Sequence, residues 1–311
     1  MIDTKRWGIL YCPHTEWIPG ITAKRREKIQ KCLDNEHIAY DLIQSEDTGS
    51  VDRLVNMLIN NGYKTIIIVG GDSALNDAVN CLMMTDKTTR DSITLGVIPN
   101  GLMNDFAHFW GINEHEITKN IKLLNQHKTR KIDLGCIHYH NNHGEACHRY
   151  FLNCINIGLI AAIMNLRSKT RHMLGSRTLS FIFSFILLIF QRMEYKMHIR
   201  INADEIKRNI MTVCIGNALG YGQTPNAVPY NGMLDVSVVY HAGVTQLIEG
   251  IYLFVRGKIL NHHSVHPYRT QKIEFLKASH ALVVIDGRLM RTPQGPFTVN
   301  VVQEVINFLV P

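Results

Sequence analysis

The stretch that decides the fold is residues 64–80, KTIIIVGGDSALNDAVN. Its β-branched run, TIIIVG at 65–70, is typical of a strand that is covered on both faces. Gly70, Gly71 and Asp72 then lead directly into an amphipathic helix pattern. Such a turn presents main-chain N–H groups and the positive end of a helix dipole, which suits a phosphate. A strand-to-helix turn also uses glycine for geometry alone, so this turn by itself does not establish a ligand.

Strand and helix patterns alternate over the first 125 residues, which indicates a parallel sheet. Strands are expected at 7–12, 37–43, 65–70 and 93–99, and helices near 22–34, 50–61, 74–84, 103–110 and 115–126. From about residue 132 the pattern changes to many short alternating segments, with helices near 159–192 and 244–256. These segments predict a sandwich or barrel of antiparallel strands. We therefore expect an α/β domain at 1–130, completed by 303–311, and a mainly β sandwich domain with inserted helices at 131–302.

Composition limits the partner and the compartment. The 311 residues carry a formal charge of +7 and a pI near 9.0, which favours nucleic acid, an acidic membrane surface or a phosphorylated small molecule. Nucleic acid is the weakest of these, because no basic patch with interleaved aromatic residues occurs in the sequence. Seven scattered cysteines without CxxC spacing favour a reducing compartment. With no secretion signal at the N-terminus, the expected location is cytoplasmic.

One apolar run, LSFIFSFILLIF at 179–190, is too short to span a bilayer as a helix. It is either a core helix or a surface that reaches a lipid. Two basic clusters could attract an acidic membrane, namely TAKRREKIQK at 22–31 and Arg167, Lys169 and Arg171. The alternative for the basic helix is an ordinary solvated face. The sequence therefore leaves two expectations for the basic helix, namely peripheral contact with the inner membrane face or an ordinary solvated face.

A second loop, GVIPNGLMNDFAHFWGI at 96–112, repeats the order of strand, turn and helix. Together the two loops resemble blocks of the diacylglycerol kinase catalytic-domain family, GGDGTxNEVxNGL and GxxPxGTxNDFAxxLGI. The similarity continues through IDLG (132–135), FLNCINIGLIAAI (151–163), GNALGYGQTPNAVPYNGMLDVSVV (216–239) and VVIDGRL (283–289). The blocks occur in the family's order over nearly the whole chain. The resemblance implies a two-domain fold, ATP, Mg²⁺ and phosphate transfer to a lipid hydroxyl.

The resemblance also implies the residues that contact the nucleotide. The implied nucleotide contacts are Ser45 and residues of the two loops, namely Gly70, Gly71, Asp72, Ser73, Ala74, Asn76, Asp77, Gly101, Leu102, Asn104 and Asp105. Among these, Asp72 is implied to be a catalytic residue. Three of these positions depart from the family. Ser73 replaces a glycine, which would strain the backbone if that position requires a positive φ. Ala74 and Leu102 each replace a threonine and remove a hydroxyl.

In the β half, the resemblance implies a magnesium held by Val228, Asn231 and Met233. The family has an aspartate where this chain has Asn231, so the ion would lose a charged ligand. The family's DGE becomes Asp286, Gly287 and Arg288. We expect Asp286 and Arg288 at the catalytic centre, with Asp286 as general base and the arginine favouring its ionised form.

Two interpretations follow. Positioning and electrostatics account for most of phosphoryl-transfer catalysis, so a divergent kinase could keep its activity without these hydroxyls. The other is a catalytically silent pseudokinase that binds lipid or nucleotide.

NAD kinases share the GGD turn but lack the NAxxNG(M/L)LDV pattern. In the histidine-rich segments 138–148 and 261–266, no histidine pair has the spacing that is typical of a zinc site. Both segments are therefore expected to be loops. Asp133 is expected to order the junction between the domains.

Overall fold

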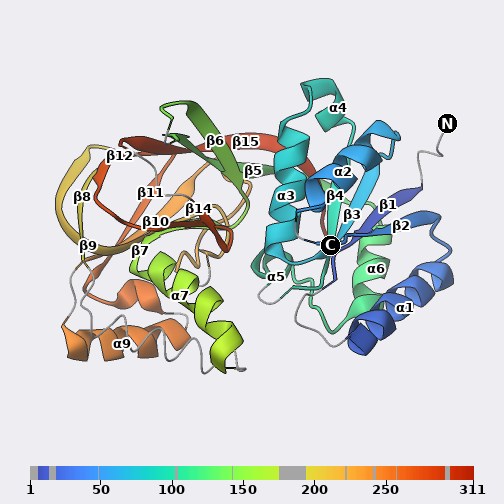
Figure 1. Cartoon of the computed structure of the whole chain (residues 1–311), viewed down its shortest axis with the longest axis horizontal. Coiled ribbons are helices and arrows are strands. Elements are labelled where there is room, and N and C mark those ends of the chain that lie inside the picture. The colour runs from blue at the N-terminus through green and yellow to red at the C-terminus, as the bar shows by residue number, and fades with distance from the viewer. Residues whose placement is uncertain are drawn as a thin grey trace. The chain divides into compact units, whose positions relative to one another are not determined.

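The structure is a computed structural model that describes residues 6–13, 19–47, 49–101, 104–141, 143–174, 194–220, 223–240, 243–256, 258–290 and 295–311. The chain forms two compact units, Met1–Asp133 with Gln303–Pro311 and Leu134–Val302. Figure 1 shows their helices and strands, coloured along the chain.

The first unit contains a parallel sheet with the strand order β2-β1-β3-β4-β15. Its strands are β1 (Trp7–Tyr11), β2 (Tyr40–Gln44), β3 (Thr65–Gly70), β4 (Thr94–Pro99) and the end of β15 (Phe297–Leu309). The β-branched β3 is buried along its whole length, as is β1. Both faces of the sheet are therefore covered, as the continuous apolar runs predict.

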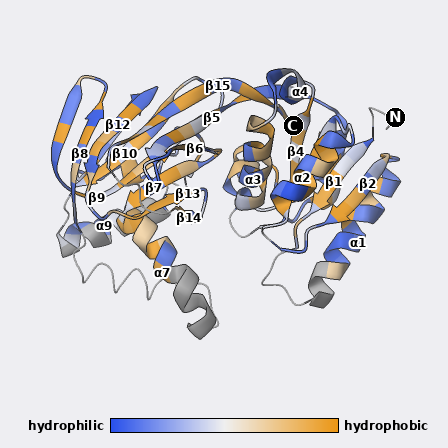
Figure 2. Cartoon of the chain, turned by 45° about the horizontal axis from the view of Figure 1, so that its top comes forward, coloured by the Kyte–Doolittle hydropathy of each residue, from blue (hydrophilic) through white to orange (hydrophobic). Residues whose placement is uncertain are grey.

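Helices of the first unit pack in two pairs, α2 with α3 and α1 with α6. The helices are α1 (Pro19–Asn35), α2 (Val51–Asn60), α3 (Asp72–Met83), α4 (Lys87–Asp91), α5 (Asp105–Phe109) and α6 (Ile117–Asn125). In α2 the buried residues Val51, Leu54, Val55 and Leu58 follow the helical repeat and form one apolar stripe. Figure 2 shows α1 as largely hydrophilic, and its Lys24, Lys28 and Lys31 are exposed.

The second unit is built from antiparallel strands in the order β14-β13-β7-β9-β8-β12-β15, with β10 pairing β9 and β11. The strands are β5 (Thr129–His140), β6 (Ala146–Phe151), β7 (Cys154–Gly158), β8 (Tyr195–Ile201), β9 (Asp204–Gly216), β10 (Leu234–Tyr240), β11 (Val265–Thr270), β12 (Lys272–Ala278), β13 (Val283–Ile285), β14 (Arg288–Met290) and the start of β15. Inward-facing residues alternate along β8, and Phe275 stacks on Phe297 with ring centroids 4.5 Å apart. The expected fold class, parallel α/β followed by antiparallel β, is confirmed.

Among the described residues of this unit, the α-helices that accompany these strands are α7 (Leu159–Leu174) and α9 (Val244–Val255). Both begin at the residues that the sequence indicates. The apolar run at 179–190 lies outside the described residues, so its expected lipid contact stays a prediction. Within the described ranges, no helix combines the length and apolar character needed to cross a bilayer.

Candidate functional site

The carboxyl ends of the parallel strands lie at one edge of the first-unit sheet. The residues that directly follow β1, β2, β3 and β4 are Cys12, Ser45, Gly71 and Asn100. The N–H of Cys12 donates to the carbonyl of Val69 (2.8 Å), and the N–H of Asn100 donates to the carbonyl of Gly70 (2.9 Å). Ligands of open α/β sheets bind at this edge. The sheet therefore brings both glycine loops to the place where a ligand is expected.

Close backbone contact joins the two loops. A Cβ on Gly101 would lie 2.3 Å from the Cα of Gly71, and a Cβ on Gly71 would lie 2.9 Å from the Cα of Gly101. The side-chain oxygen of Asn104 accepts from the N–H of Gly101 at 2.8 Å and fixes the second loop. Because Gly71 has φ −94°, glycine is needed here for close approach and not for a left-handed conformation.

Asp72 links the two loops through its carboxylate. Its two oxygens accept from the N–H of Asp105 (3.0 Å) and the N–H of Phe106 (3.1 Å). These amides begin α5, whose N-cap residue, Asn104, makes no side-chain cap bond and has φ 54°. An aspartate at helical N-terminal amides is a favourable cap. The structure therefore gives Asp72 a role in holding the loops, and its expected catalytic role stays a prediction.

The strain expected at Ser73 is not found. Ser73 lies in the first turn of α3, and it is not among the described residues with positive φ. Ala74 is buried, and a Cβ on Gly70 would lie 3.0 Å from the Cβ of Ala74. The serine therefore fits the helix that begins at this turn. Leu102 lies outside the described residues.

The thiol of Cys12 has a hydrogen bond with Ser45 and interacts electrostatically with Asp77. Burial raises the pKa of Cys12 to about 11, while the Ser45 hydrogen bond acts in the opposite direction and the charge of Asp77 adds to the increase. Ser45 and Asp77 are themselves buried, as is Asn76 one residue earlier. The thiol is therefore protonated at neutral pH and is a poor nucleophile.

Two residues that the sequence analysis missed also build this edge. The side-chain amide of Asn100 donates to the carbonyl of Cys12 at 3.0 Å. The guanidinium of Arg25 donates to the carbonyls of Pro99 (2.8 Å) and Glu114 (2.9 Å). The position of Asn100 directly after a strand was a usable signal. No sequence signal separates Arg25 from the exposed lysines of the same basic helix.

In the second unit, Asp286 holds the turn between β6 and β7. One carboxylate oxygen accepts from the N–H of Leu152 (2.7 Å), and the other accepts from Asn153 (3.0 Å) and Cys154 (2.9 Å). Asp286 is 2% exposed and has φ 42°. A carboxylate that receives three main-chain donors is strongly fixed in place. Arg288 follows at the start of β14 and is partly exposed.

The turn expected to hold magnesium is closed by its own hydrogen bonds. The side-chain oxygen of Asn231 accepts from the N–H of Met233 at 2.9 Å, and the carbonyl of Val228 accepts from the N–H of Tyr230 at 2.8 Å. Mg²⁺ prefers tightly arranged oxygen ligands, commonly with a carboxylate. Because Asn231 is neutral, this turn offers Mg²⁺ no carboxylate, and its residues do not form the charged site that a structural magnesium prefers.

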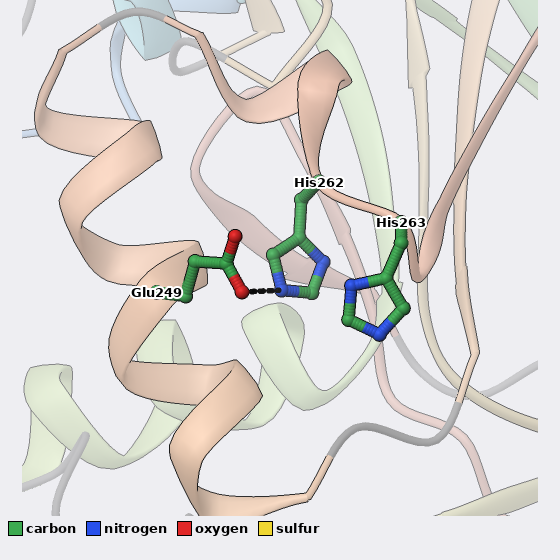
Figure 3. A group of neighbouring side chains, drawn as sticks. All are labelled: Glu249, His262 and His263. Carbon is green, nitrogen blue, oxygen red and sulfur yellow. Dashed lines mark ion pairs between the residues drawn. The ribbon is translucent and has the colours of Figure 1, made fainter.

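A different group, Glu249, His262 and His263, places possible metal ligands within 4.8 Å of one another in the described part of the chain (Figure 3). The buried His262 has both ring nitrogens engaged, however. Nε2 lies 2.8 Å from the carbonyl of Gln246, and Nδ1 accepts from the N–H of Ser264 at 3.2 Å. A carbonyl only accepts, so Nε2 carries the proton and neither nitrogen has a lone pair for an ion. His262 therefore fastens α9 to the segment after the short turn Ile259–Asn261.

Other sequence predictions have clear outcomes. The histidine-rich segment 138–148 forms the β5–β6 hairpin, with its tip between His140 and Ala146. Asp133 is buried and accepts from the N–H of Glu304 at 2.9 Å, where β15 enters the first unit. Both residues belong to the first unit, so the expected role of Asp133 at the junction between the domains stays a prediction.

The expected site residues divide between the two units. The residues of the two glycine loops, together with Ser45, belong to the first unit, whereas Asp286, Arg288 and the Val228–Met233 turn belong to the second. Within the first unit, Gly71, Asp72, Gly101, Asn104 and Asp105 are brought into direct contact. The structure therefore places the predicted site residues in two groups, one in each unit, and their role in a site stays a prediction.

Comparison with protein families identifies both parts of the chain. Residues 20–137 match the family model of the diacylglycerol kinase catalytic domain. Residues 153–310, more than half of the chain, match the YegS C-terminal NAD kinase beta sandwich-like domain. The two matches follow each other in the order that the sequence blocks indicate.

Individual relatives and structures agree with this assignment. The diacylglycerol kinase of Bacillus subtilis is 25% identical over 240 residues, which are 76% of this chain and 72% of that protein. An Alcanivorax borkumensis protein named "Probable lipid kinase YegS-like" is 28% identical over 65% of each chain.

Two solved structures share the fold. A diacylglycerol kinase from Bacillus anthracis superposes with a TM-score of 0.67 at 16% identity, covering 99% of this chain and 97% of its own. Yeast NADH kinase has a TM-score of 0.52 at 10% identity, covering 98% of this chain and 83% of its own. Together with the family matches, this places the chain in the diacylglycerol kinase and YegS family of bacterial lipid kinases.

Proposed function

We propose that this protein is an ATP-dependent lipid kinase that transfers the γ-phosphate of ATP to a lipid hydroxyl. Kinases of the diacylglycerol kinase family use ATP. The observation that carries the proposal is the contact between Gly71 and Gly101, where either Cβ would collide with the other loop. Such a requirement for bare backbone is typical of loops that approach a phosphate.

The start of α3 is the candidate phosphate site. The first amides of a helix have no carbonyl of their own helix to bond, and here Gly71 provides no side-chain cap. The twelve-residue α3 adds the positive end of its dipole at the same place. The amides of this first turn would therefore hold the phosphate tail, and the missing hydroxyls of Ala74 and Leu102 remove only auxiliary contacts.

In this proposal, Asp72 and Asp286 act mainly by positioning. Asp72 keeps the second loop against the first, and Asp286 keeps the β6–β7 turn in shape. Phosphoryl transfer depends largely on positioning and electrostatic stabilisation, so it tolerates a weak general base. Arg288 would contribute positive charge to the transferring phosphate or to the lipid headgroup.

The direct test incubates the purified protein with Mg-ATP and dispersed diacylglycerol and analyses the lipids by mass spectrometry. We expect a phosphorylated lipid, and we expect Mg-ATP alone to raise the unfolding temperature by linkage. A Gly49→Ala protein serves as a control variant that should keep both results, because its added Cβ would meet only Asp47 Oδ1, at 3.4 Å. Absence of both the product and the ATP-induced shift contradicts the proposal.

A silent lipid-binding or nucleotide-binding protein is the second candidate. It is favoured by the engaged carboxylates of Asp72 and Asp286 and by the Asn231 turn, which offers magnesium no carboxylate. The same melting experiment separates the two functions. Stabilisation by lipid or ATP without any phosphorylated product would support the silent candidate.

The partner in this proposal is a lipid within a membrane, reached from the cytoplasm. The exposed Lys24, Lys28 and Lys31 of α1 provide positive charge that an acidic bilayer would attract. Co-sedimentation with vesicles of anionic and of neutral lipid tests this contact. Equal binding to both vesicle types would argue against an electrostatic contribution.

A further inference from the structure

The core of the second unit contains three asparagines that are fully buried, Asn153, Asn156 and Asn217. The side-chain amides of two of them, Asn156 and Asn217, donate hydrogen bonds to other residues. The amide nitrogen of Asn156 donates to the sulfur of Cys154 (3.2 Å), and its oxygen accepts from Gln223 (2.8 Å). Asn217 donates to the carbonyl of Leu152 at 2.9 Å. These two amides are therefore part of the hydrogen bonding that holds the fold.

Asn153 differs from both. Within the part of the chain that the structure describes, neither its amide nitrogen nor its amide oxygen has a hydrogen-bond partner, although both atoms are buried. A buried amide without partners is costly, because it has lost its bonds to water. Native proteins contain few such groups, so each one requires an explanation, and a functional role is one of them.

The main chain of Asn153 is nevertheless fixed on both sides. Its N–H donates to Asp286 at 3.0 Å. Its carbonyl accepts from the N–H of Asn217 (2.8 Å) and the N–H of Ala218 (3.1 Å). The side chain is therefore presented from a rigid backbone beside Asp286, which is how binding groups are preorganised.

The chemistry of the amide selects its ligand. It offers a donor and an acceptor together, and a hydroxyl is the simple group that both donates and accepts. A phosphate needs donors alone, and a metal ion needs acceptors alone. We propose that the Asn153 amide binds the free hydroxyl of the acceptor lipid. This inference rests on the proposed function, since it names a recognition residue for the alcohol that receives the phosphate. Because the amide is fully buried, the hydroxyl reaches it only through a local opening of the packing.

The experiment compares dioctanoylglycerol, which has one free hydroxyl, with trioctanoylglycerol, which has none. The readout is the unfolding temperature of the full chain with each dispersed lipid, which does not depend on turnover. We expect dioctanoylglycerol to stabilise the wild-type protein more, by about 2–4 °C. In Asn153→Leu we expect this preference to disappear while the ligand-free protein keeps or gains stability. Phosphorylation of dioctanoylglycerol should fall about 100-fold.

Asn156→Leu is the matched control, because it is an equally buried asparagine whose amide has partners. It should lower the ligand-free unfolding temperature and keep the hydroxyl preference. The inference is overturned if the wild type shows no preference, if Asn153→Leu retains it, or if Asn156→Leu loses it as well. Should Asn153→Leu not fold, Asn153→Ala replaces it, and failure of both to fold makes the amide structural and also overturns the inference. A wild type with the preference but without turnover refutes the kinase proposal alone.

Discussion

Asp72 in the first unit and Asp286 in the second are both aspartates that the sequence analysis expects to be catalytic, yet the two environments differ. Asp72 is 9% exposed and receives two main-chain donors from a five-residue helix. Asp286 is 2% exposed, receives three donors and occupies a left-handed backbone position. The comparison teaches that a carboxylate in a family motif can act by fixing loops. We expect the stability that each carboxylate provides to depend on how many main-chain N–H groups it accepts from and on how exposed those groups are to water.

The largest expected effect is the loss of stability when each aspartate is replaced by alanine, which tests this comparison directly. Asp286→Ala should lower the free energy of unfolding by about 3–5 kcal/mol, because three buried amides lose their acceptor. Asp72→Ala should cost about 1–3 kcal/mol, since its two amides are closer to solvent. Urea denaturation of both variants measures the difference. Asp286→Asn, which keeps one acceptor oxygen and tolerates the left-handed position, should fall between the wild type and Asp286→Ala. Equal losses for the two alanine variants would remove the distinction drawn here.

A second change sharpens the description of the first unit. Gly101→Ala should lower stability by about 1–3 kcal/mol, because its Cβ would lie 2.3 Å from the Cα of Gly71. We also expect it to reduce the stabilisation by Mg-ATP, measured as the shift in unfolding temperature. Gly49→Ala should leave both quantities nearly unchanged, since its added Cβ meets only Asp47 Oδ1, at 3.4 Å. If Gly101→Ala behaves like Gly49→Ala, the two loops are not in contact in solution.

The dependence of the free energy of unfolding on high pH allows a comparison of the two units, because each contains a buried thiol. Burial raises the pKa of Cys81 in the first unit and of Cys136 in the second from 9.0 to about 12. Below pH 9 both the folded and unfolded chains keep these protons. Between pH 9 and about 12 only the unfolded chain releases them, so rising pH favours unfolding. We expect the free energy of unfolding to fall across this window, and Cys81→Ala and Cys136→Ala each to flatten the decrease. A pH profile unchanged by either substitution would contradict the burial of these thiols.

The smallest expected effect concerns the altered loop tip. Ser73→Gly should destabilise the protein by about 0.5–1 kcal/mol, because Ser73 is helical and glycine costs conformational entropy in a helix. Stabilisation by Ser73→Gly would instead reveal backbone strain at this position. Ser73→Ala is a suitable control, since it removes the hydroxyl without adding backbone freedom. Differential scanning calorimetry can resolve changes of this size.

The sequence by itself was sufficient for the fold class and for the order of elements along the chain. The buried β-branched runs indicated strands covered by helices, and β3 and β4 are found where these runs occur. Glycine and aspartate after a strand indicated the loop positions, since the carboxyl ends of parallel strands share one edge. What it could not indicate was the partner of each side chain. Hydrogen bonds such as those from Leu152 to Asp286 join residues far apart in the chain.

The tertiary structure alone decided three questions about individual side chains. It removed the strain expected at Ser73, because the φ of a residue depends on where its helix begins. It showed that the Asn231 oxygen already bonds to Met233, which no residue pattern records. Among the residues that the structure describes, it also left the amide of Asn153 without hydrogen-bond partners while satisfying that of Asn156 three residues later. Local patterns determine strands, helices and turns through backbone preference and hydrophobic burial, whereas the satisfaction of a buried polar atom depends on which distant donor or acceptor packs against it.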